Sequence, residues 1–374
     1  MSLRTAWGTL VLGIMFTFIA AARASAVTLV VGPESCAPGY PHFATIQGAV
    51  DSAVPGDTTI EVCSGTYREQ VVITQPMIIT GLDDGSGLPA VVAVPAAGLV
   101  GNVSMPVSGL VAAQVVLRDT WGVQLENLTI DGAGAACAAA VGASKVAGVA
   151  LLNMLSDDPS WISTYVGQNE IRNQGGSVCD RSSTGILSEN SLVEVDHNYL
   201  HHITGDAVAL NGASAVVWNN TMWKCGFSAV EMTGLQNATI SDNTMTEVRS
   251  GAELNASVNI NVWTNTMGPW LGYGIVTHNG SLSWIDSNYI ESTFFGVYLD
   301  QSLSDRVTDN WIVTTQSIGL VDLLSRGGNQ IWDNTFNNAP IGIDIDQASL
   351  VIDDLGPNTF TNVVSSVTSS GNPF

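Results

Sequence analysis

The sequence predicts an all-β protein, a right-handed parallel β-helix built as a solenoid of 22–23-residue coils with a short N-terminal capping helix. The first observation behind this prediction is a small residue that recurs at that spacing through the C-terminal half. It stands at Gly185, Ala207, Ala229, Gly251, Gly274, Gly296, Gly319 and Gly342. The second observation is that apolar and polar residues alternate within each copy, as in 342–346, with many Val, Ile and Thr residues. Each copy is therefore predicted to consist of strands and turns.

Two further columns repeat together with the small residue. The residue that follows it is aliphatic in every copy, from Ile186 to Ile343, and an asparagine follows 13 to 16 residues after it. These asparagines are Asn198, Asn220, Asn243, Asn265, Asn288, Asn310, Asn334 and Asn358. Stacked copies bury the aliphatic column in one core, and they place the asparagines above one another at a tight bend, where asparagine tolerates a left-handed backbone. A leucine-rich repeat has the same period, but its second half is helical or leucine-based, and here that half is another alternating strand.

The chain is expected to form one domain after a secretion signal at residues 1–26. Arg4, the apolar run 10–22 and the small residues of 24–26 are typical of such a signal. The single β-helix domain, 27–374, is expected to comprise an N-terminal cap at about 36–81, irregular coils with loop insertions at about 82–184, regular coils at about 185–360 and a C-terminal tail at about 361–374.

The N-terminal cap is predicted to contain the only amphipathic helix of the solenoid. Residues 46–54 place their apolar side chains on one face, and Pro55 and Gly56 follow directly. A helix at this point covers the open end of the apolar core, as terminal repeats of a solenoid must.

The charge balance limits the partners of the chain. It has 33 acidic and 11 basic residues, a formal charge of −22, with 45% hydrophobic residues. Such a surface repels phosphate backbones, so we expect no nucleic-acid partner. No segment after residue 26 has about 18 consecutive apolar residues, so we expect no membrane insertion of the mature chain. The mature protein is expected to be a secreted, extracellular or periplasmic, monomer.

The five cysteines all follow the signal, in a chain bound for a compartment where disulfides persist. Cys36 and Cys63 bracket the predicted cap helix, and Cys137 and Cys179 fall in the same turn of successive coils. These placements predict two disulfides and an unpaired Cys225.

Three short motifs near the N-terminus resemble a known superfamily. The runs Phe43–Gln47, Pro55–Asp57 and Gly65–Glu69 are similar to the opening of pectin-methylesterase-like and pectate-lyase-like β-helix proteins. Together with the repeats, the resemblance covers nearly the whole mature chain. It implies the β-helix fold. It implies no single activity, since that superfamily includes lyases, hydrolases, esterases, epimerases and proteins with no known reaction.

Two catalytic signatures of this superfamily are present in part. Residues 205–212 resemble the Gly-Asp-Asp segment of galacturonan hydrolases with the second aspartate missing. Residues 273–279 resemble the Tyr-Gly-x-Asp-Pro-His-Asp run of alginate epimerases and related lyases, with the tyrosine, glycine and histidine kept and both aspartates lost. The esterase motifs have no counterpart.

The stacking of the copies predicts one patch of polar side chains. Positions two and four after the small residue point outward, which makes Glu231 and Glu253 stacked neighbours and places His278 and Asp300 beside them. The preceding turn adds His201, His202, Asp206, Lys224, Arg249 and Tyr273. The candidate catalytic residues are Glu231, Glu253, His278, Asp206, Lys224, Arg249, Tyr273 and Asp300.

This patch suggests proton abstraction next to a sugar carboxylate, which needs a base and a cation that stabilises the enolate. Lys224 or Arg249 with Tyr273 and His278 would supply the first, and Glu231 with Glu253 would hold a metal such as Ca²⁺ for the second. Each of these residues has a plain alternative as a solvated surface group.

Two other features bear on the function. The enlarged turns at about 131–147 and 172–184 are expected to form a wall beside the patch. Outward tryptophans such as Trp263 and Trp311 stack on sugar rings or pack under loops. The sequence therefore predicts a secreted carbohydrate-active protein, a lyase, epimerase or hydrolase acting on an extracellular polysaccharide or cell-surface glycan. The alternative is a non-catalytic adhesion or glycan-binding solenoid.

Overall fold

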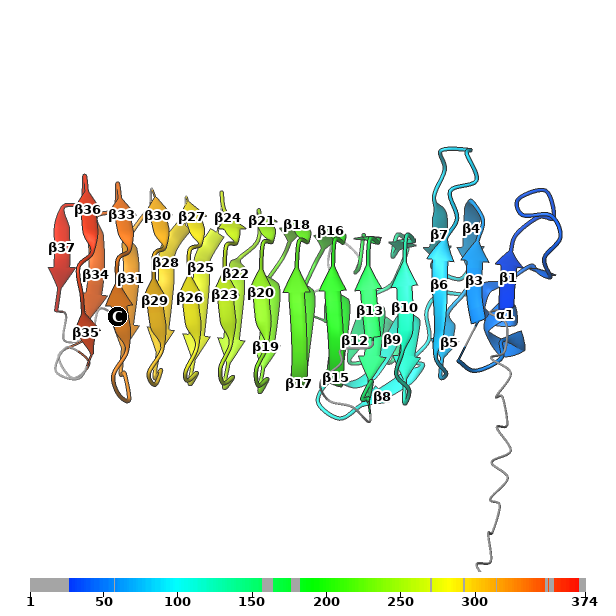
Figure 1. Cartoon of the computed structure of the whole chain (residues 1–374), viewed down its shortest axis with the longest axis horizontal. Coiled ribbons are helices and arrows are strands. Elements are labelled where there is room, and N and C mark those ends of the chain that lie inside the picture. The colour runs from blue at the N-terminus through cyan, green and yellow to red at the C-terminus, as the bar shows by residue number, and fades with distance from the viewer. Residues whose placement is uncertain are drawn as a thin grey trace, which may run out of the picture.

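A computed structural model describes residues 27–369 apart from 57, 157–163, 176–181, 270, 292, 314, 347–348 and 350–352. The chain winds into an elongated solenoid whose strands stack side by side along its long axis, from β1 at one end to β37 at the other (Figure 1). Each strand pairs in parallel with the strand one coil later, apart from one antiparallel hairpin. The predicted all-β parallel β-helix is confirmed.

Each regular coil contributes one strand to each of three faces. The first face is a twelve-stranded sheet. Its members are β4 (Gly65–Arg68), β7 (Ala90–Ala93), β11 (Thr129–Asp131), β14 (Glu170–Arg172), β16 (Tyr199–Ile203), β18 (Thr221–Cys225), β21 (Thr244–Thr246), β24 (Thr266–Met267), β27 (Tyr289–Glu291), β30 (Trp311–Val313), β33 (Thr335–Asn337) and β36 (Thr359–Thr361).

The second face, here called the small-residue face, carries the small-residue column. Its members are β5 (Val71–Ile73), β9 (Gly109–Arg118), β12 (Lys145–Leu152), β15 (Ser183–Asp196), β17 (Asp206–Trp218), β19 (Ser228–Thr233), β22 (Ser250–Asn255), β25 (Leu271–His278), β28 (Thr293–Asp300), β31 (Ile318–Leu323), β34 (Ile341–Ile345) and β37 (Ser365–Thr368). The strand β8 (Val103–Met105) pairs antiparallel with β9.

The third face follows the small-residue face along the chain, and β15 and β17 are long enough to run through both. The other members of the third face are β1 (Val27–Val31), β3 (Thr58–Val62), β6 (Met77–Gly81), β10 (Val123–Glu126), β13 (Thr164–Gly167), β20 (Thr239–Ser241), β23 (Asn261–Trp263), β26 (Trp284–Asp286), β29 (Arg306–Thr308), β32 (Gln330–Trp332) and β35 (Asp354–Leu355). The remaining elements are β2 (His42–Phe43), α1 (Ile46–Ser52) and the 3₁₀ turn η1 (Ala138–Val141).

Small residues occupy the column on the small-residue face because a larger side chain at these positions would clash with atoms of the core. A Cβ on Gly274 would lie 2.4 Å from the carbonyl oxygen of Gly296 and 2.6 Å from Cγ2 of Ile290 on the opposite sheet. The next residue, Ile275, pairs with Val297 one coil later and has no exposed surface. The aliphatic column therefore lines one continuous core, as predicted.

The predicted asparagine ladder is present, and it begins one coil earlier, at Asn169. Asn265 shows the pattern, because its Oδ1 accepts from the backbone N–H of Asn243 at 3.0 Å and its Nδ2 donates to Oδ1 of Asn288 at 3.0 Å. The expectation of a left-handed backbone at the ladder asparagine is wrong by one residue. The positive φ angles fall on the preceding residue, for example Thr264 at 54° and Ser287 at 55°. The asparagine is instead turned inward, where its amide bonds the adjacent coils.

The N-terminal cap is built from helix α1 and a disulfide. Ile46, Ala49 and Val50 of α1 are buried against the core, and the Thr45 side chain caps the helix start. The helix ends at Ser52, two residues earlier than predicted, because Ala53 is already extended ahead of Pro55.

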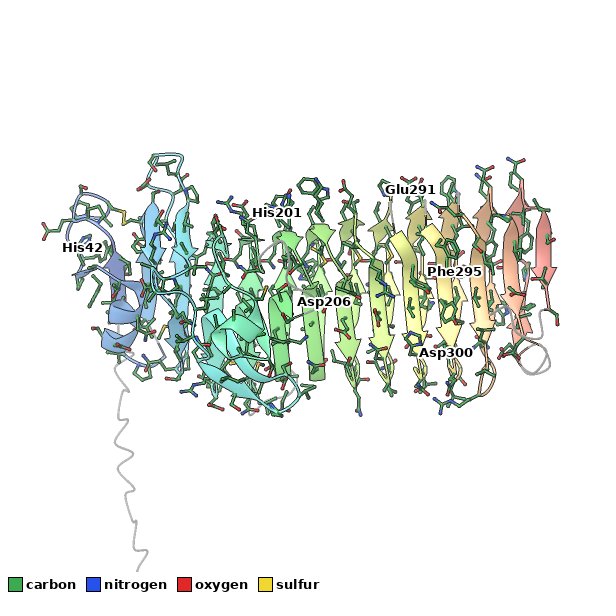
Figure 2. The ribbon with its side chains drawn as sticks, turned by 180° about the vertical axis from the view of Figure 1, so that it is seen from behind. His42, His201, Asp206, Glu291, Phe295 and Asp300 are labelled. Atoms are coloured by element: carbon green, nitrogen blue, oxygen red, sulfur yellow. A yellow bond between two sulfur atoms is a disulfide. The ribbon has the colours of Figure 1, made fainter. Side chains whose placement is uncertain are left out.

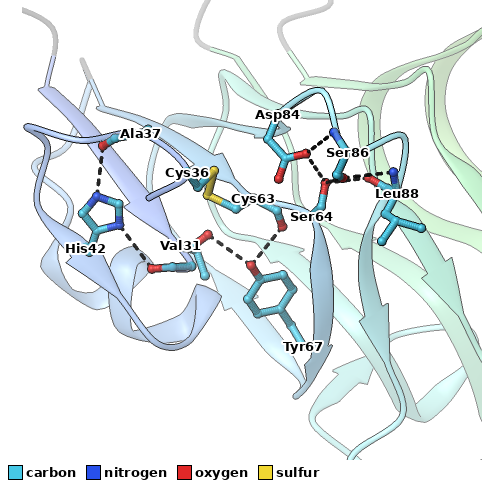
Figure 3. Close-up of a disulfide and its surroundings, with 11 residues drawn as sticks. Val31, Cys36, Ala37, His42, Cys63, Ser64, Tyr67, Asp84, Ser86 and Leu88 are labelled. Atoms are coloured by element: carbon cyan, nitrogen blue, oxygen red, sulfur yellow. Dashed lines mark hydrogen bonds between the residues drawn. A yellow bond between two sulfur atoms is a disulfide. The ribbon is translucent and has the colours of Figure 1, made fainter. Parts of the chain in front are cut away.

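The cysteines confirm part of the predicted disulfide pattern. Cys36 and Cys63 are bonded, and Figure 3 shows the bond beside the Tyr67 hydroxyl, which lies 2.9 Å from the carbonyl of Cys63. Cys225 is free and buried, as predicted. Cys179 lies outside the described residues, so its predicted bond to Cys137 stays a prediction.

Both ends of the chain bear on the predicted organisation. Residues 1–26, the predicted signal, lie outside the described residues. At the other end, part of the expected tail is structured, since β37 at 365–368 pairs with β34 and continues the small-residue face. Within the described part of the chain, no helix has the length and apolar character needed to cross a membrane.

Candidate functional site

A groove on the small-residue face gathers four of the eight predicted site residues: Arg249, Glu253, Tyr273 and His278. It has a volume of about 160 Å³, and strands β22, β25 and β28 supply most of its walls. It is lined by Arg249, Ser250, Glu253, Tyr273, Val276, His278 and Tyr298. These side chains meet because equivalent positions of successive coils are in register: Glu253 pairs with Val276 and Val276 with Tyr298. Figure 2 labels Phe295 and Asp300 along β28 beside this groove.

A histidine–aspartate pair is the most specific feature of the groove. His278 Nδ1 lies 3.1 Å from Oδ2 of Asp300, its register partner one coil later, and 38% of the histidine side chain is exposed. An imidazole that donates its Nδ1–H to a carboxylate keeps Nε2 as an acceptor. Asp300 therefore places a carboxylate against His278 from one coil later, whereas the run 273–279 itself has neither aspartate of the epimerase signature.

An aromatic cluster closes the groove on one side. The Tyr273 ring is stacked on Phe295 with a centroid distance of 5.3 Å, and the Tyr298 ring lies 5.8 Å from Tyr273. Burial, helped by the charge of Asp300 and by Tyr273, raises the pKa of Tyr298 above its ordinary value. Tyr298 therefore keeps its phenolic proton at neutral pH and can donate it. Its outward position, two residues after Gly296, is evident from the repeat, but the patch predicted from the sequence does not include it.

The two stacked glutamates are neighbours as predicted, but their carboxylates bind different groups. Glu231 and Glu253 are register partners in β19 and β22. The Ser228 hydroxyl donates to Glu253 at 2.9 Å, whereas the Asn255 amide donates to Glu231 at 3.4 Å. Glu253 lines the groove and Glu231 does not.

Asp206 and Lys224 lie away from the groove. Asp206 is 6% exposed, and its Oδ1 accepts from the backbone N–H of Ser228 at 3.0 Å, so it stabilises the start of β19. Lys224 lies at the bend that ends β18, in a different cavity. The single patch expected from the sequence is therefore divided, because the chain bends between the twelve-stranded sheet and the small-residue face.

The cavity that contains Lys224 is the larger one, with a volume of about 760 Å³. The segment Gly132–Gly134 lines this cavity, so the enlarged turn at 131–147 lies beside it and not, as expected, beside the groove. Part of the second enlarged turn, 176–181, lies outside the described residues. A further hollow of about 590 Å³ shares Glu247 with this cavity and Arg249 with the groove, so it joins the two.

Toward the N-terminus, the outward side of the small-residue face is closed rather than open. The outward residues Leu187 and Ala209 are buried in an apolar cluster with Val103 and Met105 of the β8–β9 hairpin. The Glu189 carboxylate holds this hairpin by accepting from the backbone N–H groups of Val107 and Ser108 at 2.8 and 2.7 Å. The groove therefore begins only where the hairpin ends.

Comparison with known proteins identifies the family. The family model described as "Periplasmic copper-binding protein (NosD)" matches residues 163–372, which is more than half of the chain. The chain belongs to the NosD family. The periplasmic location in the family description and the Cys36–Cys63 disulfide agree with an exported protein. No curated protein matches the chain.

Solved structures confirm the β-helix fold of this NosD-family chain. The A-module of the Azotobacter vinelandii mannuronan C-5 epimerase AlgE6 is 15% identical, with a TM-score of 0.61 and coverage of 87% of this chain and 91% of that one. The Dettilon tailspike protein is 13% identical, with a TM-score of 0.60 and coverage of 84% and 64%. The GH136 lacto-N-biosidase from Eubacterium ramulus is 11% identical, with a TM-score of 0.54 and coverage of 91% and 68%.

The described residues do not fit the copper centre that the NosD family description implies. Copper takes thiolate, thioether and imidazole ligands. Over the ranges that the structure describes, no group of three His, Cys, Asp or Glu side chains is arranged to hold a metal ion. Burial raises the pKa of the Cys225 thiol to about 12, so it stays protonated, and the thioethers of Met222 and Met245 lie in the closed core. The same finding leaves Glu231 and Glu253 without a third acidic ligand for calcium among the described residues.

Proposed function

We propose that this exported NosD-family protein acts on an acidic extracellular polysaccharide in the groove, by removing the proton next to a sugar carboxylate as a lyase or an epimerase does. The observation that carries the proposal is the His278–Asp300 pair, 3.1 Å apart, in a groove that also contains Arg249, Tyr273 and Tyr298. The carbohydrate-active β-helix proteins of similar fold support this substrate class.

The steps follow from the properties of these groups. Nε2 of His278 takes the proton from the carbon next to the carboxylate, and Asp300 stabilises the imidazolium that forms. The Arg249 guanidinium neutralises the carboxylate and the enolate that develops from it. Tyr298 is still protonated at neutral pH, and its hydroxyl donates the proton that completes the reaction. That proton goes to the opposite face of the carbon in an epimerase, or to the departing glycosidic oxygen in a lyase. The His278 imidazolium then returns its proton through solvent to the Tyr298 phenolate, which restores both groups.

Of the three reactions predicted from the sequence, hydrolysis has less support from the groove than elimination or epimerisation. Glycoside hydrolysis by the usual route needs two carboxyl groups on either side of the scissile bond. Glu253 lines the groove, whereas its stacked neighbour Glu231 does not. The geometry therefore favours a histidine base over a carboxylate pair.

The test is an assay of the full exported chain on uronate polymers. Ultraviolet absorbance of unsaturated ends detects a lyase, and deuterium uptake at the carbon next to the carboxylate in D₂O detects an epimerase. We expect His278→Ala and Asp300→Asn to lower the rate by about 10²- to 10⁴-fold. His197→Ala is the matched control, because His197 is an exposed histidine paired with Asp196 away from the groove. Equal rates for His278→Ala and the wild type would overturn the proposal.

Calcium at the stacked glutamates stays a prediction. If Ca²⁺ assists at Glu231 and Glu253, the double variant E231Q/E253Q loses activity or Ca²⁺ binding with almost no change in melting temperature. Titration calorimetry with CaCl₂ on the wild type and the double variant measures this. Full activity and unchanged binding in the double variant would remove calcium from the mechanism.

A second candidate is a glycan-binding solenoid without catalysis. Trp263, Trp284 and Trp311 are 40%, 41% and 53% exposed, which suits stacking on sugar rings. Trp284 also lines a hollow of about 430 Å³ with Arg306 on the third face. In this case Trp284→Ala weakens glycan binding, whereas His278→Ala leaves it unchanged and no polymer is altered.

A further inference from the structure

The large cavity beside the groove lies at one bend position of four successive coils. Asn173, His202, Lys224 and Glu247 occupy this position, each with a left-handed backbone, with φ between 53° and 56°. Their strands are in register, since His201 pairs with Trp223 and Met222 with Met245. The bend therefore sets His202, Lys224 and Glu247 side by side along the wall of a cavity of about 760 Å³, within the size range of small-ligand sites.

A chain of short contacts links the His202 ring to the Glu170 carboxylate through His201. Nε2 of His201 lies 3.0 Å from Oε1 of Glu170, and Nδ1 of His201 lies 2.7 Å from Nδ1 of His202. The Glu170 carboxylate also accepts from Arg172 at 2.8 Å and from Thr129 at 3.1 Å. Although burial opposes it, the hydrogen bonds from His201, Arg172 and Thr129 lower the pKa of Glu170, so it is ionised.

The tautomers follow from this chain. An ionised Glu170 accepts the Nε2–H of His201, so Nδ1 of a neutral His201 is an acceptor. His202 then donates its Nδ1–H to His201, which leaves Nε2 of His202 as an acceptor on a side chain that lines the cavity. Burial lowers the pKa of His202, and so do the charge of Lys224 and that of His201 whenever His201 is protonated, against the opposite effect of Glu247; a lowered pKa agrees with a neutral His202 ring. The Trp223 ring packs against His202 with a centroid distance of 4.9 Å and helps to hold it.

Lys224 supplies the positive charge in the cavity. Its Nζ lies 4.2 Å from the centroid of the Trp223 ring and 3.9 Å from Oε2 of Glu247, a long ion pair. The other carboxylate oxygen of Glu247 accepts from Nε1 of Trp223 at 3.0 Å. The Lys224 side chain is 43% exposed, so its ammonium group has N–H donors left for a ligand anion. Arg172, the other basic residue near the relay, is bound to Glu170 and Asp131.

We propose that this cavity is a second binding site of the same acidic polysaccharide, in which Lys224 pairs with a sugar carboxylate and Nε2 of His202 accepts a hydrogen bond from a sugar hydroxyl. This inference rests on the proposed function for its substrate class. The hollow that shares Glu247 with the cavity and Arg249 with the groove gives the polymer a path between the two. From β14 to β28 this path spans six coils, or about 24 Å at the usual strand spacing.

Two local cations favour an acidic ligand over a neutral one at this point, against the negative charge of the molecule as a whole. The chain has 11 basic residues against 33 acidic ones, and Lys224 and Arg249 both lie along the path. On such an acidic surface, these two cations are the groups that attract a polyanion. The segment Gly132–Gly134, which lies in the coil preceding that of Asn173, also lines the cavity, and its two glycines let the polymer approach the backbone closely.

The experiment is a calorimetric titration of the full exported chain with trigalacturonate and trimannuronate, and with the neutral trisaccharides made by reducing their carboxylates. We expect Lys224→Met to weaken binding of an acidic trisaccharide about tenfold or more, because a hydrogen-bonded charge pair is lost. The same variant leaves the neutral trisaccharide unaffected. Lys224→Arg keeps the charge and restores binding. His202→Ala weakens binding of both forms, and His197→Ala weakens neither.

The tautomer is read from the ring nitrogen signals of ¹⁵N-histidine-labelled protein. We expect a bare Nε2 on His202 in the free protein, whose signal moves when the acidic trisaccharide is added. A protonated Nε2 would overturn the relay. Unchanged binding in Lys224→Met and His202→Ala would overturn the second site. It would not affect the proposal for the groove, which His278→Ala tests separately. A wild type that binds none of the acidic trisaccharides would overturn both proposals.

Discussion

Asp305 is a single buried residue that makes the stability of the solenoid depend on pH. The side chain has no exposed surface, and its Oδ1 accepts from the backbone N–H of Ser283 at 2.8 Å. Its Oδ2 has no hydrogen-bond partner among the described residues. Burial raises the pKa of this carboxyl to about 7, although the Ser283 bond acts in the opposite direction. The folded chain therefore holds a proton that the unfolded chain loses near pH 4.

This difference predicts that stability falls as the pH rises from about 4 to about 7, at up to about 1.4 kcal/mol per pH unit for this one group. Above pH 7 the full cost of the buried charge is present. Asp305→Asn removes the charge and keeps an acceptor for Ser283. Urea unfolding at pH 5 and pH 8 should show the variant gaining stability relative to the wild type at the higher pH.

The matched control for this prediction is Asp309→Asn, since Asp309 is exposed four residues along the chain. Its free energy of unfolding, measured against that of the wild type, should not change between the two pH values. A constant difference between Asp305→Asn and the wild type would mean that Asp305 is ionised in the core already at pH 5.

At the scale of the element, the coils are held by columns that tolerate little change. The glycines of the small-residue column lie where a Cβ would meet both the next coil and the opposite sheet. For Gly296 these contacts are 2.3 Å to the carbonyl oxygen of Gly319 and 2.5 Å to Cγ2 of Ile312. Backbone atoms cannot rotate away as a side chain does, so the coil itself would have to shift.

Gly296→Ala is therefore expected to destabilise the protein by about 3 kcal/mol, the upper end for overpacking. Gly280→Ala is the matched control, because its added Cβ meets nothing closer than 3.6 Å. Chemical denaturation of both variants measures the contrast, with the control within about 1 kcal/mol of the wild type. Equal losses in the two variants would show that the small-residue column is not under packing constraint.

The asparagine ladder predicts a second contrast at this scale. Asn265 is buried, and its loss removes the acceptor of the backbone N–H of Asn243 and the side-chain donor to the carbonyl of Ile240. Oδ1 of Asn288 loses one of its two donors and keeps the backbone N–H of residue 265. We expect Asn265→Ala to cost about 3 kcal/mol or more, since each unpaired buried group costs about 1–3 kcal/mol. The control Asn261→Ala, at a half-buried position on β23, should cost far less. Thermal unfolding of both variants decides whether the ladder supports the fold.

At the scale of the whole molecule, stability passes from coil to coil. Each strand pairs with the strands one coil away on either side, so the ends of the solenoid open more easily than its middle. The amino end is closed by α1 and by the disulfide between Cys36 and Cys63, which are 27 residues apart. The Glu69 carboxylate adds to this closure by accepting from the backbone N–H groups of Ile46 and Gln47 at 2.8 and 2.9 Å.

The double variant C36S/C63S is expected to lose about 2–4 kcal/mol of stability at this end, because a loop that the disulfide closes is released. Hydrogen exchange followed by mass spectrometry should show faster exchange in β1, α1 and β3, with β23 to β30 unchanged. Cys225→Ala removes a thiol outside any disulfide and should leave the exchange of the amino end as it is. Faster exchange along the whole solenoid in C36S/C63S would contradict unfolding from the end.

The sequence by itself determined the length of the coil, the register between coils and the helix that caps the amino end. A constant spacing is enough to place Glu231 on Glu253 and His278 on Asp300, because strand pairing repeats identically from one coil to the next. The same regularity predicted the asparagine ladder, and the apolar face of 46–54 predicted the capping helix. Such features depend only on neighbouring coils.

Only the tertiary structure decided which outward positions are open and which form one site. Leu187 and Glu253 occupy equivalent outward positions of the repeat, yet Leu187 is buried by the β8–β9 hairpin. This hairpin is held by a hydrogen bond from the backbone N–H of Ser108 to Glu189, which is 81 residues away in the chain. Lys224 and Arg249 share the patch in the sequence, but the bend after β18 sends Lys224 into another cavity. Insertions and bends of this kind break the repeat, so their contacts join distant segments that no periodic pattern records.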